Sequence, residues 1–265
     1  MHEHHASTIA AATAHFRADP SVLVLLLGGS IAHGFATASS DVDLLIVLTE
    51  EAYAERVASR KLTYVSAELA TYAGGYIDAK YLSPSFVEQV AERGSEPARF
   101  AFEGARVLYS KEGFDVQGFE ALMRRAVAYP VEGKADRIRR FRVQLEAWKW
   151  FCLEGRNKRN QYLLGLAAAK LVLFGGRLIL AHNEILYPFH KWFLKVLEGA
   201  PDKPEGIMEC IDRVLADPSE QNVEAFYVMV KDFQDWGEWN PRWGPQFMLD
   251  NELTWMTGHP AVDDL

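Results

Sequence analysis

Two aspartates separated by one residue, Asp41 and Asp43, stand at the head of an apolar run in the segment SSDVDLLIVL. Side chains two positions apart in a strand lie on the same face, so both carboxylates are expected to project together. Two carboxylates held this close repel each other unless a cation lies beside them. Hard oxygen ligands of this kind suit Mg²⁺ or Mn²⁺, which take their remaining ligands from water and substrate phosphates. The pair therefore indicates a metal site that handles phosphates.

A glycine-rich turn precedes the aspartates, because Gly28, Gly29 and Ser30 follow the apolar run 22–27. Without Cβ atoms the backbone of the two glycines can approach a ligand closely, and the amides of a following helix attract anions. Ser30 is a candidate N-cap for a short helix that Gly34 ends. Each motif alone also has a structural interpretation, as a helix cap or as a turn. Their order and spacing between two apolar runs favour a phosphate site beside a metal site.

A third acidic candidate lies in GYIDAKYL, residues 75–82, whose alternating pattern predicts a strand. Asp78 stands between two apolar residues of this segment, where an unpaired carboxylate would be costly to bury. A shared metal ion removes that cost, and the alternative is an aspartate on the exposed face of an edge strand. Glu68 and Glu103 lie in mixed polar surroundings and are expected on the surface.

The elements that must hold these residues follow from the hydrophobic pattern. Residues 22–27 and 42–48 are typical of strands buried on both faces, and residues 50–60 have helical periodicity. Ser83 and Pro84 predict the cap and first turn of another helix. A further short strand is expected at 106–109.

The pattern changes after about residue 113, where strand signals end and apolar residues recur at three- or four-residue steps. We expect Gly175 and Gly176 to end or bend one of the resulting helices. The expected helices cover about 134–154, 160–174 with a continuation at 177–181, 188–197, 204–216 and 220–233. The predicted fold class is α+β: residues 1–115 form a mixed β-sheet with flanking helices, and residues 116–265 form an all-α bundle.

The stretch GGSIAHGFATASSDVDLLIV resembles the signature of the nucleotidyltransferase superfamily, which includes DNA polymerase β and the antibiotic nucleotidyltransferases. That signature is Gly-[Gly/Ser]-Ser followed about ten residues later by Asp-x-Asp between apolar residues. The residues that match it are Gly29, Ser30, Gly34, Ser40, Asp41 and Asp43.

The resemblance implies an N-terminal nucleotidyltransferase fold and a metal site of Asp41, Asp43 and a third acidic residue, for which Asp78 is the candidate. Asp78 would serve as a metal ligand or as the general base. The implied cofactors are Mg²⁺ or Mn²⁺ and a nucleoside triphosphate, with ATP favoured. The residues implied to bind the nucleotide are Gly28, Gly29, Ser30, Gly34 and Ser40.

The second half is similar to the helical bundle of kanamycin-type nucleotidyltransferases and to HEPN bundles, through its helix lengths and the segment HNEILYPFHKWF. In those enzymes the bundle covers the nucleotide and shapes the acceptor pocket. The implied reaction transfers AMP to a hydroxyl of a small-molecule acceptor, such as an aminoglycoside or another antibiotic, and releases pyrophosphate. Two alternatives stay open: an antitoxin-like enzyme that attaches AMP to a protein, and a nucleotide-binding regulator without catalysis.

Two further patterns in the second half admit competing interpretations. Arg177 and His182 have the Arg-x4-His spacing of HEPN ribonucleases, but Glu184 replaces the tyrosine that often follows there. Three tryptophans, Trp236, Trp239 and Trp243, lie among glycines and prolines and would pack the domain junction, line a pocket or stack on a base or sugar.

Composition limits the partners and the compartment. The formal net charge of −8 argues against an extended nucleic-acid surface and suits a cationic small molecule. Cys152 and Cys210 lie far apart, so reduced thiols and a cytoplasmic location are expected. No membrane association is expected, since no apolar segment approaches the roughly 18 to 20 residues that span a bilayer. A homodimer is compatible with the sequence, and three histidines, His2, His4 and His5, are expected in a frayed polar tail.

Overall fold

The protein divides into two compact units, Met1–Ala128 and Tyr129–Leu265. The structure is a computed structural model that describes residues 1–237, 243–256 and 258. The sequence analysis placed the division between residues 115 and 116. Helix α6 (Val116–Ala126) instead lies in the N-terminal unit, because Phe119 and Met123 pack into one of that unit's cores.

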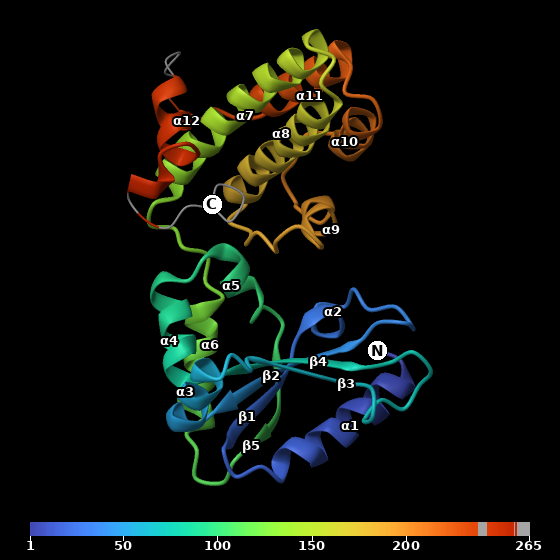
Figure 1. Cartoon of the computed structure of the whole chain (residues 1–265), viewed down its shortest axis with the longest axis vertical. Helices are drawn as coiled ribbons and strands as arrows, with labels where there is room; N and C mark the ends of the chain where they lie inside the picture. Colours follow the sequence, from blue (N-terminus) through green and yellow to red (C-terminus); the bar gives the residue numbers. More distant parts are fainter. Residues whose placement is uncertain (238–242, 257, 259–265) are drawn as a thin grey trace. The chain divides into compact units, whose positions relative to one another are not determined.

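The N-terminal unit is built on a five-stranded sheet in the order β3-β4-β2-β1-β5 (Figure 1). Strands β2 and β4 are parallel, whereas the other neighbouring pairs are antiparallel, so the sheet is mixed as predicted. The short edge strand β3 was not predicted, because none of its four residues is buried and it therefore lacks a clear apolar pattern. The strands are β1 (Val22–Leu27), β2 (Val42–Leu48), β3 (Thr63–Ser66), β4 (Ile77–Leu82) and β5 (Arg106–Ser110).

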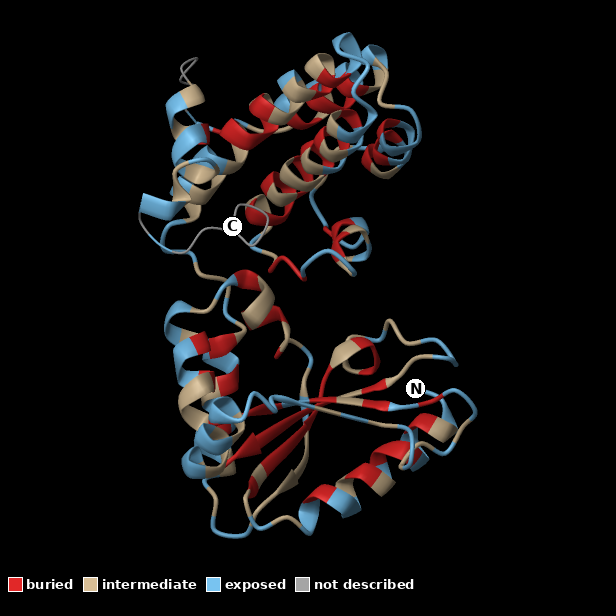
Figure 2. Ribbon diagram, in the orientation of Figure 1, coloured by how far each residue is buried: buried red, intermediate tan, exposed pale blue. Residues whose placement is uncertain are grey.

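Helices cover both faces of this sheet (Figure 1). Helix α1 (Glu3–Arg17) packs on one face, in a core with the alternate side chains of β2 and β4. Helices α4 (Pro84–Arg93) and α6 pack on the other. Figure 2 shows the central strands as almost continuously buried, which explains why β1 and β2 are apolar on both faces. The remaining helices of this unit are α2 (Gly29–Ala32), α3 (Glu50–Ala58) and α5 (Glu96–Phe100).

The expectation of a frayed N-terminal tail was wrong. Helix α1 begins at Glu3, and the side chain of His5 is fully buried. The physical reason is an apolar stripe at helical spacing, Ile9, Ala12 and Phe16, which docks the helix on the sheet and orders its first turn.

The second unit is helical, as predicted. Its two longest helices, α7 and α8, pack along each other (Figure 1). Cys152 and Cys210 are both buried and free, so they form no disulfide. Burial raises the pKa of the Cys152 thiol to about 12, which keeps it protonated. The helices are α7 (Lys134–Asn157), α8 (Gln161–His182), α9 (Phe193–Glu198), α10 (Ile207–Ala216), α11 (Glu220–Lys231) and α12 (Gly244–Asp250), followed by a 3₁₀ turn at Thr254–Met256.

The glycine pair does not end the helix, because α8 continues through it to His182. A Cβ atom at Gly175 would lie 2.6 Å from Cζ of Phe226, and one at Gly176 would lie 2.3 Å from Cζ of Phe193. Both positions therefore need glycine because aromatic rings from neighbouring helices pack directly on the backbone of α8.

Helix α8 also corrects the expectation about apolar length. It has 22 residues, and the mean hydropathy of its most apolar stretch is 1.9, so it is long and apolar enough to cross a membrane. Half of that stretch is buried inside the protein, as in the core helix of a water-soluble fold. A single helix of this kind is weak evidence for a membrane span.

Candidate active site

Three carboxylates from two neighbouring strands meet at one end of the sheet. Asp41, Asp43 and Asp78 each place a carboxylate oxygen so that all three atoms lie within 4.8 Å of one another. All three residues are partly buried. The structure thus brings together the three acidic residues that the sequence analysis selected.

The strand register explains this convergence. Asp43 of β2 lies directly opposite Asp78 of the parallel strand β4. The neighbours of both aspartates are buried in the core beneath α1, and side chains alternate along a strand. Asp43 and Asp78 therefore project together toward the opposite face. Asp41, two positions before Asp43, joins them from the residue that precedes β2.

Gly29 lies directly against this cluster. Its φ is +58°, in the left-handed region that favours glycine. A Cβ atom there would lie only 1.8 Å from Oδ2 of Asp43. The preceding amide of Gly28 donates a hydrogen bond of 3.0 Å to the backbone carbonyl of Asp43. The glycine turn and the carboxylates therefore form one continuous site, and only glycine fits at position 29.

Ser30 is buried, and its hydroxyl has no hydrogen-bond partner among the residues that the structure describes. A buried hydroxyl without a partner destabilises a protein by about 1–3 kcal/mol. Such a group is therefore a good candidate for a contact with a bound ligand.

The other residues of the predicted nucleotide site have distinct local roles. Gly28 is the N-cap of α2, and Gly34 adopts φ +77° where the chain leaves that helix. The hydroxyl of Ser40 accepts a hydrogen bond of 2.9 Å from the amide of Thr37. Ser40 thus closes the turn that leads into Asp41.

Two tyrosines missed by the sequence analysis border the cluster. A hydrogen bond to Asp41, together with the nearby negative charge, raises the pKa of the exposed Tyr76. Burial, and then the charge of Asp41, raises the pKa of Tyr72. Both phenols therefore stay protonated as hydrogen-bond donors. Tyr72 carries no periodic signal, whereas Tyr76 falls within the predicted strand 75–82 but was not assigned to the site; in the structure both lie between β3 and β4.

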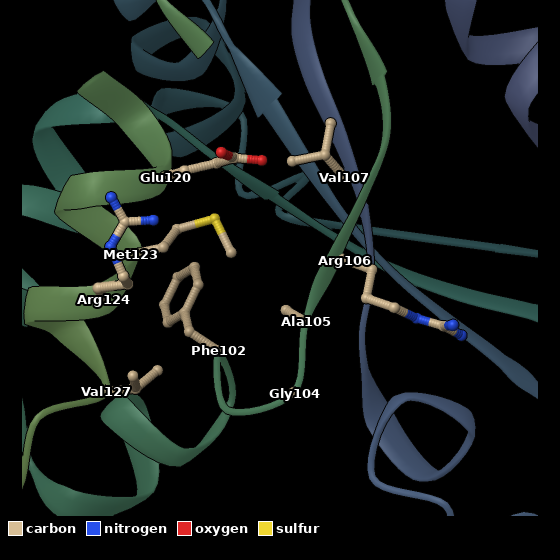
Figure 3. A pocket seen from close by; sticks show the side chains of 9 residues that line it. All are labelled: Phe102, Gly104, Ala105, Arg106, Val107, Glu120, Met123, Arg124 and Val127. Atoms are coloured by element: carbon tan, nitrogen blue, oxygen red, sulfur yellow. The ribbon is translucent and has the colours of Figure 1, made fainter. Parts of the chain in front are cut away.

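A separate pocket of about 450 Å³ lies between α6 and the start of β5 (Figure 3). Figure 3 shows Arg106 pointing away from it, whereas Glu120 and Met123 extend toward the strand. None of the three aspartates contributes to its lining, which consists of Phe102, Gly104, Ala105, Arg106, Val107, Glu120, Met123, Arg124 and Val127. Nearby, burial raises the pKa of Glu103, which is half-buried rather than solvated as expected.

The candidate residues of the helical unit are engaged in separate interactions. The guanidinium of Arg177 lies over the rings of Phe141 and Tyr187, at 4.4 and 4.2 Å from their centroids. His182 instead contacts Asp202 at 2.5 Å. These separate contacts do not favour a shared ribonuclease site. Trp239 lies outside the described residues.

The comparison with protein families agrees with the class of protein that this site indicates. The model of the nucleotidyltransferase domain family matches residues 15–94, which include all three aspartates and the glycine turn. A crystal structure of a nucleotidyltransferase-like protein from Exiguobacterium sibiricum aligns over 86% of this chain and 73% of that chain, with 9% identity and a TM-score of 0.46. A likeness this distant carries no argument about activity. A comparison with curated proteins gives no match.

The site and the family match together define a domain that transfers nucleotidyl groups. The chain therefore contains a nucleotidyltransferase domain at residues 15–94, the catalytic domain of a nucleotidyltransferase enzyme.

Proposed function

We propose that the protein transfers AMP from ATP to a hydroxyl group of a small-molecule acceptor and releases pyrophosphate. The observation that carries this proposal is the convergence of Asp41, Asp43 and Asp78 beside the turn at Gly29. Three carboxylates without a bound cation repel one another, whereas a divalent cation neutralises their charge and can also bind the phosphates of a triphosphate.

The residues present fit Mg²⁺ or Mn²⁺. The three carboxylates form a set of hard oxygen donors, and the hydroxyl of Ser30, which has no partner within the described part of the chain, can donate to a phosphate oxygen. When bound, the metal ion would neutralise charge on the triphosphate and make the acceptor hydroxyl easier to deprotonate.

The chain's own residues would orient the reaction. Ser30 and the amide of Gly29 would hold the β- and γ-phosphates, because no side chain at position 29 blocks their approach. The acceptor oxygen would attack the α-phosphorus as the bond to the β-phosphate breaks, and pyrophosphate leaves. Asp78 would take the acceptor proton or hold the metal ion; the two roles differ in their pH dependence.

The acceptor is proposed from charge. The net charge of −8 suits a polycationic small molecule such as an aminoglycoside, and it disfavours an extended nucleic acid. Antibiotic modification is therefore the first activity to test.

The test incubates the protein with each labelled nucleoside triphosphate and Mg²⁺, against aminoglycosides, lincosamides and candidate proteins. Label on a small molecule supports the proposal, whereas label on a protein would identify an enzyme that modifies a partner. Saturable nucleotide binding without pyrophosphate release would identify a regulator.

The matched variant is Asp41→Asn, which keeps the shape of the side chain. Transfer should fall at least about 10³-fold, since metal-ion catalysis supplies several kcal/mol. Near wild-type turnover of this variant with Mg²⁺ would rule out the proposed chemistry.

A further inference from the structure

The backbone carbonyl of Ser40, the residue before Asp41, is held by two side chains from distant parts of the chain. Nε2 of His5, in α1, lies 3.1 Å from this oxygen. The hydroxyl of Tyr72, in the loop before β4, donates to the same oxygen at 2.5 Å. His4 adds a contact of 2.9 Å from its Nε2 to the carbonyl of Ala38.

The donor at His5 follows from the chemistry of its partner. A carbonyl oxygen only accepts hydrogen bonds, so Nε2 of His5 carries the proton. Its other ring nitrogen, Nδ1, is buried and has no partner among the described residues. Burial and the neighbouring His4 lower the pKa of His5, which keeps the ring neutral. An apolar ring would fill this position without leaving a nitrogen unsatisfied, so packing alone does not explain a histidine here.

The two donors hold the peptide group that precedes Asp41 and orients its backbone. The Ser40 carbonyl belongs to the peptide group that joins Ser40 to Asp41, and this group is planar. Fixing the oxygen therefore fixes the amide of Asp41 and limits where its carboxylate can lie. Asp41 precedes β2, so it is not paired with β4 in the sheet as Asp43 is.

We propose that His5 and Tyr72 are positioning residues that clamp the Ser40 carbonyl and thereby hold the Asp41 carboxylate in place to bind the metal ion. This inference rests on the proposed function, because it assigns the clamp to the same metal site. The N-terminal helix thus contributes to the active site without touching the substrate.

The experiment measures the affinity of the full-length protein for Mn²⁺ without nucleotide, from the electron paramagnetic resonance signal of free Mn²⁺. Tyr72→Phe and His5→Phe each remove one donor but keep a ring. His5→Gln retains an amide donor near the position of Nε2.

The control is Thr8→Val, because Thr8 joins the same helix to the same loop. Its hydroxyl contacts the hydroxyl and the amide of Thr71 at 2.9 and 3.0 Å, so its partners lie outside the clamp. This variant loosens the packing of α1 without removing a donor from the clamp.

We expect Tyr72→Phe and His5→Phe each to raise the dissociation constant for Mn²⁺ about five-fold, and the double variant to raise it further. His5→Gln should restore most of the lost affinity. Thr8→Val should lower the thermal midpoint but leave the dissociation constant within about two-fold of wild type.

The outcomes separate the inference from the proposed function. Unchanged Mn²⁺ affinity in folded Tyr72→Phe and in folded His5→Gln/Tyr72→Phe would overturn the clamp. This conclusion requires that wild type binds Mn²⁺ and that Asp41→Asn does not. Equal weakening by Thr8→Val would also overturn it, because general packing would then explain the effect. If wild type binds Mn²⁺ no better than Asp41→Asn, the proposed metal site fails and the clamp fails with it.

Discussion

The two units of the protein treat their acidic side chains in opposite ways. In the helical unit acidic groups lie beside basic ones: Lys134 contacts Glu184 at 2.8 Å, and Lys149 contacts Glu224 at 2.6 Å. In the N-terminal unit Asp41, Asp43 and Asp78 lie beside one another instead.

This difference indicates that acidic side chains support stability in one unit and the chemistry of a site in the other. Pairs of opposite charge on a surface contribute little but do not oppose folding. A cluster of like charges opposes folding unless a ligand neutralises it. The acidic cluster of the N-terminal unit therefore suits a bound cation, whereas these acidic groups of the helical unit are paired with basic groups of the same chain.

Among variants that leave every charge unchanged, the largest effect is expected for Gly29→Ala, which disturbs the acidic cluster. The new Cβ atom would meet Asp43 Oδ2 at 1.8 Å, so either the turn or the carboxylate must move. Transfer should fall at least about 100-fold, because misplacement by about 1 Å is enough for such a loss. A steady-state assay of pyrophosphate release measures it.

Gly113→Ala is the matched control for this variant. Gly113 also has a positive φ, +80°, but nothing lies within 4 Å of a Cβ atom there, and it is not one of the predicted nucleotide-binding residues. The strain should destabilise the N-terminal unit by about 1 kcal/mol and leave transfer within a few-fold of wild type. Equal loss of transfer in both variants would show that backbone strain, and not the clash with Asp43, controls the activity.

Mg²⁺ should stabilise one unit and leave the other unchanged. At about ten times its dissociation constant, the ion should stabilise the N-terminal unit by about 1.4 kcal/mol. Hydrogen-exchange mass spectrometry should show slower exchange in peptides from β2 and β4, and no change in peptides from α8. Protection that persists in Asp41→Asn would mean that the ion binds elsewhere.

Neutralising one carboxylate in each unit should change stability in opposite directions. Without divalent metal, Asp78→Asn should stabilise the N-terminal unit by a few tenths of a kcal/mol, because one of three like charges is lost. Glu184→Gln should destabilise the helical unit by up to about 0.5 kcal/mol, because it breaks the pair with the partly exposed Lys134.

Tryptophan fluorescence suits the measurement on the helical unit, since every tryptophan lies beyond residue 147. Hydrogen exchange in β4 reports on the N-terminal unit. A loss of stability in both variants would contradict the contrast between the two units.

The sequence predicted the central strands and the acidic cluster because their signals are local. The apolar runs at 22–27 and 42–48 coincide with β1 and β2. The i, i+2 spacing put Asp41 and Asp43 on one face, and the parallel register of β2 and β4 then brings Asp78 to Asp43.

The parts that were missed depend on contacts between distant segments. His5 and Tyr72 reach Ser40 across 35 and 32 positions in the sequence, and no periodic pattern marks such pairs. Similarly, the sequence signal of Gly175 is that of a helix end, but the structure shows that Phe226 packs directly on it. In both cases tertiary packing decides the role of a residue whose local signal is ambiguous.

The smallest expected effect is a pH dependence of the stability of the N-terminal unit. It comes from His33, a half-buried histidine of that unit. Its ring stacks on Phe100 at 4.4 Å and on Phe35 at 5.5 Å, and burial lowers its pKa from the ordinary value of 6.5. Below that value the unfolded chain binds more protons than the folded chain, so stability falls as the pH falls. The fall should reach a few tenths of a kcal/mol between pH 7.5 and 5.5.

His33→Phe keeps the stacked ring and removes the titrating group, so it should show a smaller loss on acidification. Hydrogen exchange in β1 and β2 at the two pH values, corrected for intrinsic rates, measures the difference. Part of the loss should remain in the variant, because burial lowers the pKa of His5 in the same direction. An unchanged pH dependence in His33→Phe would assign the whole effect to other groups and remove His33 from the account of this unit's stability.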